Sequence, residues 1–169
     1  MTTRACSGLP LFCILLVWAM SSVAVCDNAR DYWPQWRGPD LNGVSRAQNL
    51  PETWSETENI VWKTHLPSWS GSTPIVWGHR VFAASPSEPE SGQSEGGSRL
   101  LLVCLAQEDG RPLWIRDLDS GNQLQHKQNM SSPSPVTDGT HVWVMTGTGT
   151  VAALTMDGDV VWKFNLQKE

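Results

Sequence analysis

The side chains that could carry out acid–base, nucleophilic or metal chemistry are few in this sequence and lie far apart. The chain has four histidines, which are His65, His79, His126 and His141. None is spaced with cysteines or carboxylates as metal ligands, or a nucleophile and its base, usually are. His79 and His141 fall in or beside expected hairpin turns, where an imidazole faces solvent. We therefore predict no catalytic residue, no cofactor-binding residue and no metal ligand.

Three aspartates are explained as turn formers, and one glycosylation sequon is explained as a chance match. Asp109, Asp138 and Asp157 each directly precede a glycine, and Asp-Gly is a strong signal for a tight turn. Asn129-Met130-Ser131 matches a glycosylation acceptor. We interpret that match as a chance product of composition.

Residues 1–24 have the pattern of a secretory signal peptide. Arg4 supplies a positive n-region, and LPLFCILLVWAM is an apolar h-region. Ser22 and Ala24 are the small residues that precede a cleavage site. We predict cleavage after Ala24 and export of the mature chain to the periplasm or the exterior. No later stretch is apolar enough to span a bilayer.

Which cysteines remain in the mature chain depends on this cleavage. Cys6 and Cys13 leave with the signal peptide. Cys26 offers an alternative, lipidation of a new N-terminal cysteine, although Val25 is larger than that processing normally tolerates. Cys104 lies in the apolar run RLLLVCL and is predicted to be a buried small hydrophobe. A disulfide between Cys26 and Cys104 would require that Cys26 stay in the mature chain.

Composition bounds the class of protein. A length of 169 residues leaves room for about one domain, and 40% hydrophobic residues allow a packed core. The net charge of −5 gives no excess of positive charge with which to bind nucleic acid or an anionic membrane. Ten tryptophans against one tyrosine indicate a recurring structural position for tryptophan.

A motif recurs along the chain. Trp62, Trp114 and Trp162 lie roughly 50 residues apart, and each precedes a leucine by four positions. Gly110 and Gly158 precede their tryptophans by four. PIVWGHRVF and PVTDGTHVW also align, with glycine four after proline and valine seven after it.

Each repeat is predicted to contain four short antiparallel strands. Gly78, Gly110, Gly139 and Gly158 are expected in the turns. Ser85 begins a polar stretch, SPSEPESGQSEGGS, which predicts a long loop at a hairpin tip. No amphipathic helical period is seen in the mature chain. The expected strands are 73–77, 80–84, 99–105 and 112–116 in the first repeat, and 134–137, 141–145, 150–155 and 160–164 in the second.

Four antiparallel strands repeating about every 50 residues form the unit of a β-propeller blade. The Trp-Asp pair of WD40 blades is absent, and the diglycine and tyrosine of kelch blades do not recur. The pattern S-x-P-x-V, then AL, DG, W and L, resembles the pyrroloquinoline quinone (PQQ)-like repeat of quinoprotein-type and BamB-like propellers. WPQWRGPDLNGVS resembles the lead-in of a secreted bacterial family that is familiar from planctomycetes. The resemblance implies an all-β partial propeller, with a lead-in at residues 25–58 and repeats at 59–169.

The resemblance also implies roles for the recurring residues. In that family a tryptophan on the outer strand docks on the turn of the neighbouring blade. By this match Trp62, Trp114 and Trp162 are docking residues, and Gly110 and Gly158 belong to turns that need a permissive backbone.

The repeats do not account for a closed ring. Two blades and a leading strand at residues 60–66 leave open edges, whereas a propeller of about eight blades is stabilised by closure. We therefore expect an N-terminal fragment whose remaining blades come from sequence after Glu169. A small sandwich built from the same strands is the alternative.

Three functions stay open. The first is a non-enzymatic extracytoplasmic scaffold that binds a protein partner in the cell envelope. The second is a fragment of a PQQ- and calcium-dependent dehydrogenase, for which the vicinal cysteines and the catalytic aspartate of that family have no match here. The third is a polysaccharide-associated module, with Trp69 and Trp77 stacking on sugar rings.

Overall fold

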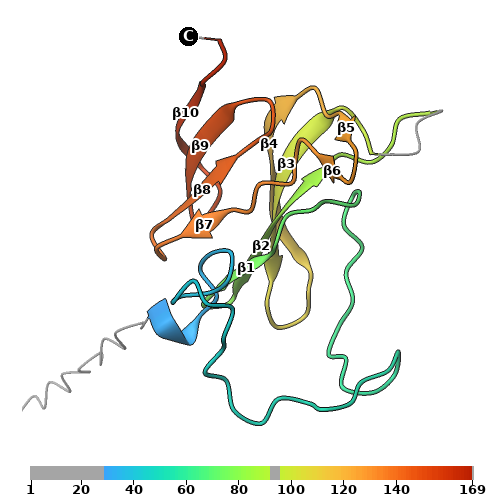
Figure 1. Cartoon of the computed structure of the whole chain (residues 1–169), viewed down its shortest axis with the longest axis vertical. Helices are drawn as coiled ribbons and strands as arrows, with labels where there is room; N and C mark the ends of the chain where they lie inside the picture. The colour runs from blue at the N-terminus through green and yellow to red at the C-terminus, as the bar shows by residue number, and fades with distance from the viewer. Residues whose placement is uncertain (1–28, 92–95, 169) are drawn as a thin grey trace, which may run out of the picture.

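The computed structural model describes residues 29–91 and 96–168, and in this part of the chain every β-pairing is antiparallel. Two four-stranded sheets lie side by side and a two-stranded hairpin flanks them (Figure 1). The all-β fold is confirmed. The predicted signal peptide and Cys26 lie outside the described residues.

The first sheet is a meander that corresponds to the first predicted repeat. Its strands run in the order β1 (Ile75–Trp77), β2 (Arg80–Pro86), β3 (Arg99–Ala106) and β4 (Pro112–Ser120). Strand β3 is apolar at nearly every position because both of its faces are buried. Strand β4 is longer than predicted because its pairing with β3 continues past Arg116 to Ser120.

The second sheet repeats this meander. It contains β7 (Val136–Thr137), β8 (His141–Met145), β9 (Thr150–Thr155) and β10 (Val160–Asn165), with β10 and β7 at its edges. The bounds of β8 and β9 match the prediction. Strand β7 is shorter than predicted, since Pro135 has no amide hydrogen to donate to a neighbouring strand.

Three features differ from the sequence prediction. A hairpin of β5 (Leu124–Gln125) and β6 (Gln128–Asn129) and a 3-10 turn, η1 (Ala29–Asp31), were not expected. The predicted leading strand at residues 60–66 is not paired as a β-strand. These residues form no ladder with another described strand, although Trp62 and Leu66 pack against β3.

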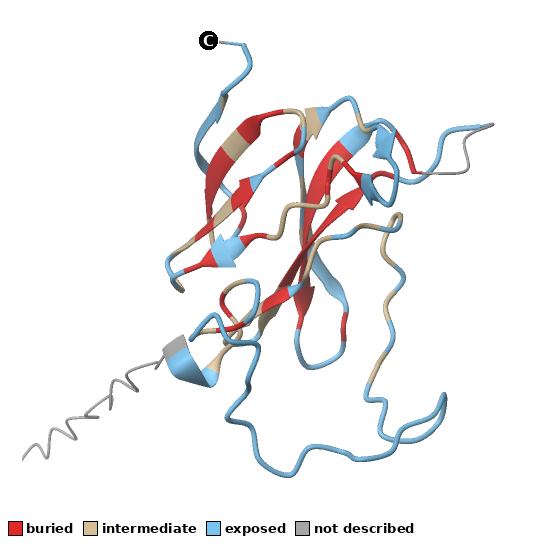
Figure 2. Ribbon diagram, viewed as in Figure 1, coloured by how far each residue is buried: buried red, intermediate tan, exposed pale blue. Residues whose placement is uncertain are grey.

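The main core lies between the two sheets. The first sheet contributes buried side chains from β1, β2, β3 and β4, and the second contributes them from β8 and β9 (Figure 2). Two consecutive four-stranded meanders that share a core are the arrangement of neighbouring propeller blades. The structure is therefore a partial propeller. The core residues are Ile75, Phe82, Leu102, Cys104, Leu118, Val142, Val144, Ala152 and Leu154.

The lead-in joins both sheets at their short edge strands. Trp33 and Val76 exchange backbone hydrogen bonds of 3.0 and 2.8 Å, which adds a bridge to β1. The next residue, Pro34, accepts a 2.9 Å hydrogen bond from the amide of Thr137 in β7. One short segment is thus bonded to both blades.

Among residues 29–91 and 96–168, no helix combines the length and the apolar character that crossing a membrane requires.

Candidate functional site

Trp114 of the first sheet lies on the turn between β9 and β10 of the second. Its indole N–H donates a 3.1 Å hydrogen bond to the carbonyl of Met156. A Cβ atom added at Gly158 would lie 2.8 Å from Cδ2 of Trp114, and Gly158 has a φ of +86°. A side chain here would strain the backbone and collide with the indole. Glycine therefore allows the ring to lie directly on the turn.

Arg116 extends this contact. Two residues after Trp114, its Nε donates a 2.6 Å hydrogen bond to the carbonyl of Gly158. Its guanidinium carbon lies 5.4 Å from the centre of the Trp114 ring, within cation–π range. The centre of the Phe82 ring, also on the first sheet, lies 5.8 Å from the centre of the Trp114 ring. The turn is thus held at two positions of β4.

Trp62 makes the equivalent contact with the first sheet. Its indole N–H donates a 2.9 Å hydrogen bond to the carbonyl of Gln107, in the turn between β3 and β4. Two residues on, the hydroxyl of Thr64 donates a 2.6 Å bond to the carbonyl of Gly110. Gly110 has a φ of +72°, and an added Cβ would overlap the Trp62 ring. The same two motif positions contact the turn in both cases.

Trp162, the third recurring tryptophan, differs from the other two. It is 41% exposed and stacks on Phe164 at 5.3 Å. In the described part of the chain its ring is not among the nearest neighbours of any glycine.

The other predicted turn glycines separate into two kinds. Gly139 has a φ of +88°, and the ring of Trp77 lies against it from the first sheet. This contact of Trp77 was not predicted from the sequence. Gly78 has a φ of +55°, but a Cβ atom added there would meet no atom within 4 Å, so only its backbone conformation favours glycine. Trp77 also contacts Tyr32, with ring centres 5.0 Å apart.

Polar side chains link the two sheets at Asp119. The hydroxyls of Thr148 and Thr150 each donate a 2.6 Å hydrogen bond to its carboxylate. Burial raises the pKa of Asp119, but these two bonds, the backbone of Ser120 and the charge of Lys168 together hold the pKa below its usual value. At the other end of the interface, Arg80 and Asp157 form a 2.6 Å ion pair. Asp157, predicted only as a turn former, therefore also joins the sheets.

The remaining candidate residues have structural surroundings. Burial raises the pKa of Cys104 to about 12, so its thiol stays protonated and unreactive. His79 is exposed and His141 is half-buried beside Trp143. The Asp138 carboxylate accepts hydrogen bonds of 2.8 Å from the amides of Thr140 and His141, as expected of a turn former.

The sequon belongs to a buried polar network. The side-chain amide of Asn129 donates a 2.9 Å hydrogen bond to the carbonyl of Trp69, and its Oδ1 accepts a 2.8 Å bond from the hydroxyl of Ser131. Asn129 is 5% exposed. This side chain ties the β6 hairpin to the segment before β1.

The residues present do not fit a quinone and calcium site. Within residues 29–91 and 96–168, no three side chains of histidine, cysteine, aspartate or glutamate are grouped to hold a metal ion. The sequence also lacks adjacent cysteines.

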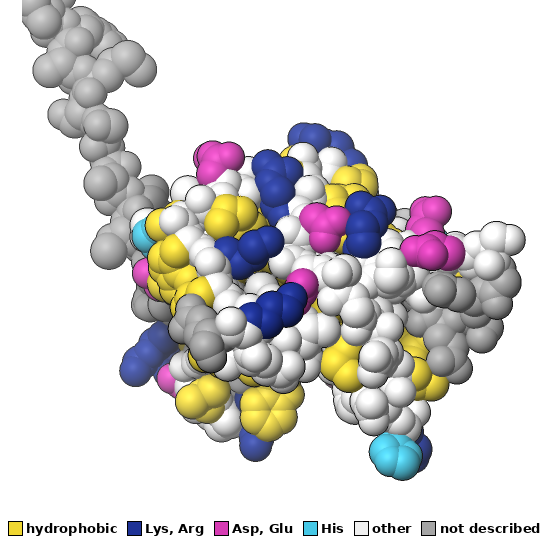
Figure 3. Space-filling view, turned by 90° about the horizontal axis from the view of Figure 1, so that it is seen from above, with side chains coloured by type: hydrophobic (Ala, Val, Ile, Leu, Met, Phe, Trp, Pro, Cys, Tyr) yellow, Lys and Arg dark blue, Asp and Glu magenta, His cyan; other side chains and the backbone are white. Residues whose placement is uncertain are grey.

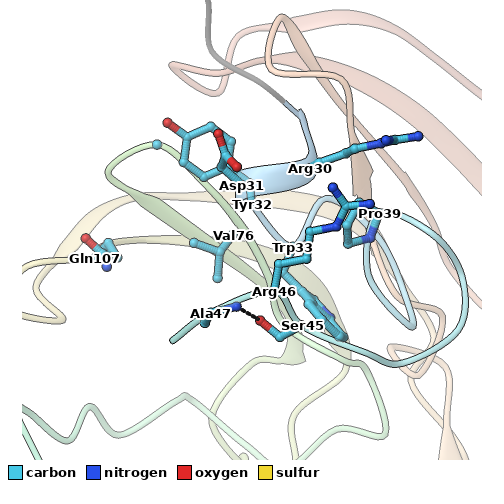
Figure 4. A pocket seen from close by; sticks show the side chains of 11 residues that line it. Arg30, Asp31, Tyr32, Trp33, Pro39, Ser45, Arg46, Ala47, Val76 and Gln107 are labelled. Atoms are coloured by element: carbon cyan, nitrogen blue, oxygen red, sulfur yellow. Dashed lines mark hydrogen bonds between the residues drawn. The ribbon is translucent and has the colours of Figure 1, made fainter. Parts of the chain in front are cut away.

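The lead-in forms one side of an open pocket of about 440 Å³ (Figure 4). Tyr32, Trp33 and Val76 supply apolar surface, and Arg46 and Asp31 supply charges of opposite sign. The pocket lies where the lead-in meets β1, and Gln107 borders it from the turn after β3.

Comparison with known proteins assigns the repeat. A family model described as "Outer membrane protein assembly factor BamB" matches residues 44–169. No curated protein matches the chain. Among matching solved structures is BamB from Moraxella catarrhalis, with 21% identity, a TM-score of 0.31, and coverage of 56% of this chain and 34% of that chain. This chain therefore spans about a third of the length of that BamB chain. Because the family model covers most of the sequence, the chain belongs to the PQQ-like repeat family of BamB-like β-propeller proteins.

Proposed function

We propose that this chain is a non-enzymatic, extracytoplasmic scaffold that binds a protein partner in the cell envelope. The observation that carries the proposal is the family match over residues 44–169, whose description names an assembly factor for outer-membrane proteins. The signal-peptide pattern of residues 1–24 supports export.

The tryptophan contacts supply the rigid frame of such a scaffold. We propose that Trp62 and Trp114 are docking residues that fix the angle between neighbouring units. Each indole combines a large apolar contact with a hydrogen bond to a turn carbonyl. Trp162 occupies the same motif position and is proposed to dock in the same way on a further unit.

The pocket beside the lead-in is the surface that we propose for the protein partner. Tyrosine, tryptophan and arginine are enriched where protein interfaces gain most of their energy. Tyr32, Trp33 and Arg46 line this pocket, and the lead-in that carries them is hydrogen-bonded to both sheets. A partner that binds here would meet a surface whose backbone is already ordered, which lowers the entropic cost of binding.

Site-specific photocrosslinking in cells tests this proposal. A photoreactive amino acid at Ser45, which lines the pocket and is exposed, is expected to form an adduct with a defined envelope protein. The matched control is Ser120, an exposed serine at the opposite end of β4 from the pocket. Adducts of equal yield at both positions, no adduct at Ser45, or a chain retained in the cytoplasm would contradict the proposal.

A further inference from the structure

The face of the molecule seen from above carries basic and acidic side chains close together, so charge of one sign marks no binding site on it (Figure 3). A different kind of site lies in the lead-in. Asn42 and Gly43 form the only Asn-Gly pair of the sequence. Both are exposed, in a loop that comes just before Ser45 and Arg46 of the pocket wall. This pair has the groups needed for a reaction within the chain.

The side chain of Asn42 is turned toward the residues that follow it. Its Oδ1 accepts a 2.9 Å hydrogen bond from the amide of Val44, which closes an Asx turn. This turn brings the side-chain carbon Cγ of Asn42 toward the peptide nitrogen of Gly43. The Val44 amide also stabilises negative charge that develops on Oδ1, as a donor in an oxyanion hole does.

Gly43 supplies an unhindered nucleophile. Glycine has no Cβ atom to obstruct the approach of its nitrogen to a carbonyl carbon. The surroundings are open as well, since a Cβ added at Gly43 would meet only Nε of Arg37, at 3.9 Å. By contrast Asn59, which is also exposed, is followed by the β-branched Ile60. Its neighbour therefore hinders the same attack.

Two aspartates form the same turn with a weaker electrophile. Asp109 and Asp138 each precede a glycine and accept a hydrogen bond from the amide two residues on, at 3.0 Å from Arg111 and 2.8 Å from Thr140. Their side chains are carboxylates, which carry negative charge and have no amine to expel. Asn42 presents an amide in this geometry, and an amide can lose ammonia.

One hydrogen bond restrains the nucleophile. The N–H of Gly43 donates a 2.9 Å hydrogen bond to the carbonyl of Arg37, and this bond must open before the nitrogen can attack. Arg37 has a φ of 64°, a left-handed conformation that costs energy in a residue other than glycine. Local opening of the loop relieves this strain and frees the nitrogen at the same time. The bond to Arg37 therefore sets how often the pair can react.

We propose that Asn42 is a self-modification site, at which the chain deamidates with water as the only other reactant. The Gly43 nitrogen forms a bond to Cγ of Asn42, and the bond from Cγ to the side-chain nitrogen breaks. That nitrogen leaves as ammonia with the proton from Gly43, and a cyclic succinimide remains. Water then adds to either of the two succinimide carbonyl carbons and breaks its bond to the ring nitrogen. The product is aspartate or isoaspartate, and no electron is gained or lost.

The reaction alters one wall of the pocket, and this consequence rests on the proposed function. Either product adds a negative charge two residues from Asp40, whose carboxylate holds Arg46 of the wall at 3.3 Å. Isoaspartate also leads the main chain through the former side chain, which lengthens the backbone by one carbon just before Ser45. We therefore expect the modified loop to bind the partner less well.

Mass spectrometry of the full chain, aged in mildly alkaline buffer and compared with fresh chain, tests the proposal. Trypsin cuts after Arg37 and Arg46, so Asn42 lies in the peptide 38–46. With age this peptide should gain the mass of an oxygen in place of NH and separate into two forms. An isoaspartyl methyltransferase should label one of them. The peptide 47–63, which contains Asn59, is the internal control and should stay unchanged.

Asn42→Gln is the matched variant, because it keeps the amide and moves it one carbon further from the nitrogen. It should lower the rate of ammonia release by at least about tenfold, since the reacting atoms lose their alignment. Gly43→Ala should also slow the reaction, because it adds a Cβ beside the nitrogen. Both variants are compared with the wild type in urea as well, where changes in folding have no influence. Unfolded wild type should react faster than folded wild type, because the bond to Arg37 is broken.

Three results would overturn the proposal. Asn42 could stay unmodified in the aged folded chain. Asn42→Gln could release ammonia as fast as the wild type, which would indicate another source. The folded chain could also react as fast as the unfolded chain, which would remove the restraint by Arg37.

Photocrosslinking in cells tests the consequence for the pocket separately. Asn42→Asp carries the charge of the product and should lower the yield of the adduct formed from Ser45. An equal yield would contradict this consequence. If neither chain forms an adduct, the proposed function fails, whereas the mass of the peptide 38–46 still decides whether Asn42 deamidates.

Discussion

Replacing Trp114 with alanine tests the contact between the two sheets. The indole lies on Gly158, donates a hydrogen bond to Met156 and contacts Phe82 in the core. Truncation of a buried aromatic side chain costs about 3–5 kcal/mol. Trp114 is only partly buried, so we expect the free energy of unfolding to fall by an amount at the lower end of this range, about 3 kcal/mol.

The expected change is large for a domain of this size. At about 2–4 °C per kcal/mol for a chain of this length, a loss of about 3 kcal/mol lowers the melting temperature by roughly 6–12 °C. Trp162→Ala is the matched control, because Trp162 has the same motif position without a turn under its ring in the described structure. Its cost should stay below about 1 kcal/mol, the value of its stacking on Phe164.

Calorimetry, or circular dichroism with urea as denaturant, measures the loss of stability of both variants at a concentration where the chain is monomeric. The reasoning is refuted if the two variants lose the same stability. It is also refuted if Trp114→Ala melts within about 2 °C of the wild type, a shift of at most about 1 kcal/mol.

Three further predictions follow from the site. Asp119→Asn should lower the free energy of unfolding by roughly 1 kcal/mol near neutral pH, because the charged acceptor for Thr148 and Thr150 is lost. Since the folded pKa of Asp119 is lowered, this stabilisation is present above the unfolded pKa of about 3.9. It is lost as pH falls through the folded pKa. Urea titrations of the wild type and of Asp119→Asn should therefore converge in acid. Cys104 should resist a thiol-specific disulfide reagent at about pH 8 in the folded chain and react once the chain is unfolded in guanidinium; equal rates in both states would contradict its burial. Titration with pyrroloquinoline quinone and calcium should show no binding by absorbance, and stoichiometric binding with alcohol-dependent dye reduction would contradict the non-enzymatic assignment.

Most strands could be predicted because their signals are local. Asp138-Gly139 and Asp157-Gly158 mark tight turns, and the apolar runs between them are the length of strands. The β5–β6 hairpin could not be predicted in this way. Its turn places His126, which is not a glycine, at a φ of 57°, a conformation for which histidine is a weak signal.

Contacts between the sheets could be predicted less well from the sequence. The resemblance to the PQQ-like repeat implied docking for Trp62 and Trp114, but the ring of Trp77 on Gly139 does not recur, since the equivalent position of the second repeat is Asp138. The ion pair between Arg80 and Asp157 also joins residues far apart in the chain. Such pairs are set by how the sheets stack, which local patterns do not specify.

Hydrogen exchange of the indole N–H groups tests the central claim most directly. The claim is that tryptophans of one unit are bonded to the turn of the next. In a nitrogen–proton correlation spectrum assigned by single Trp→Phe variants, the indoles of Trp62 and Trp114 should exchange slowly, because each donates to a turn carbonyl. The indole of Trp162 should exchange rapidly in the monomer. A Trp114 indole that exchanges as fast as that of Trp162 would contradict the account.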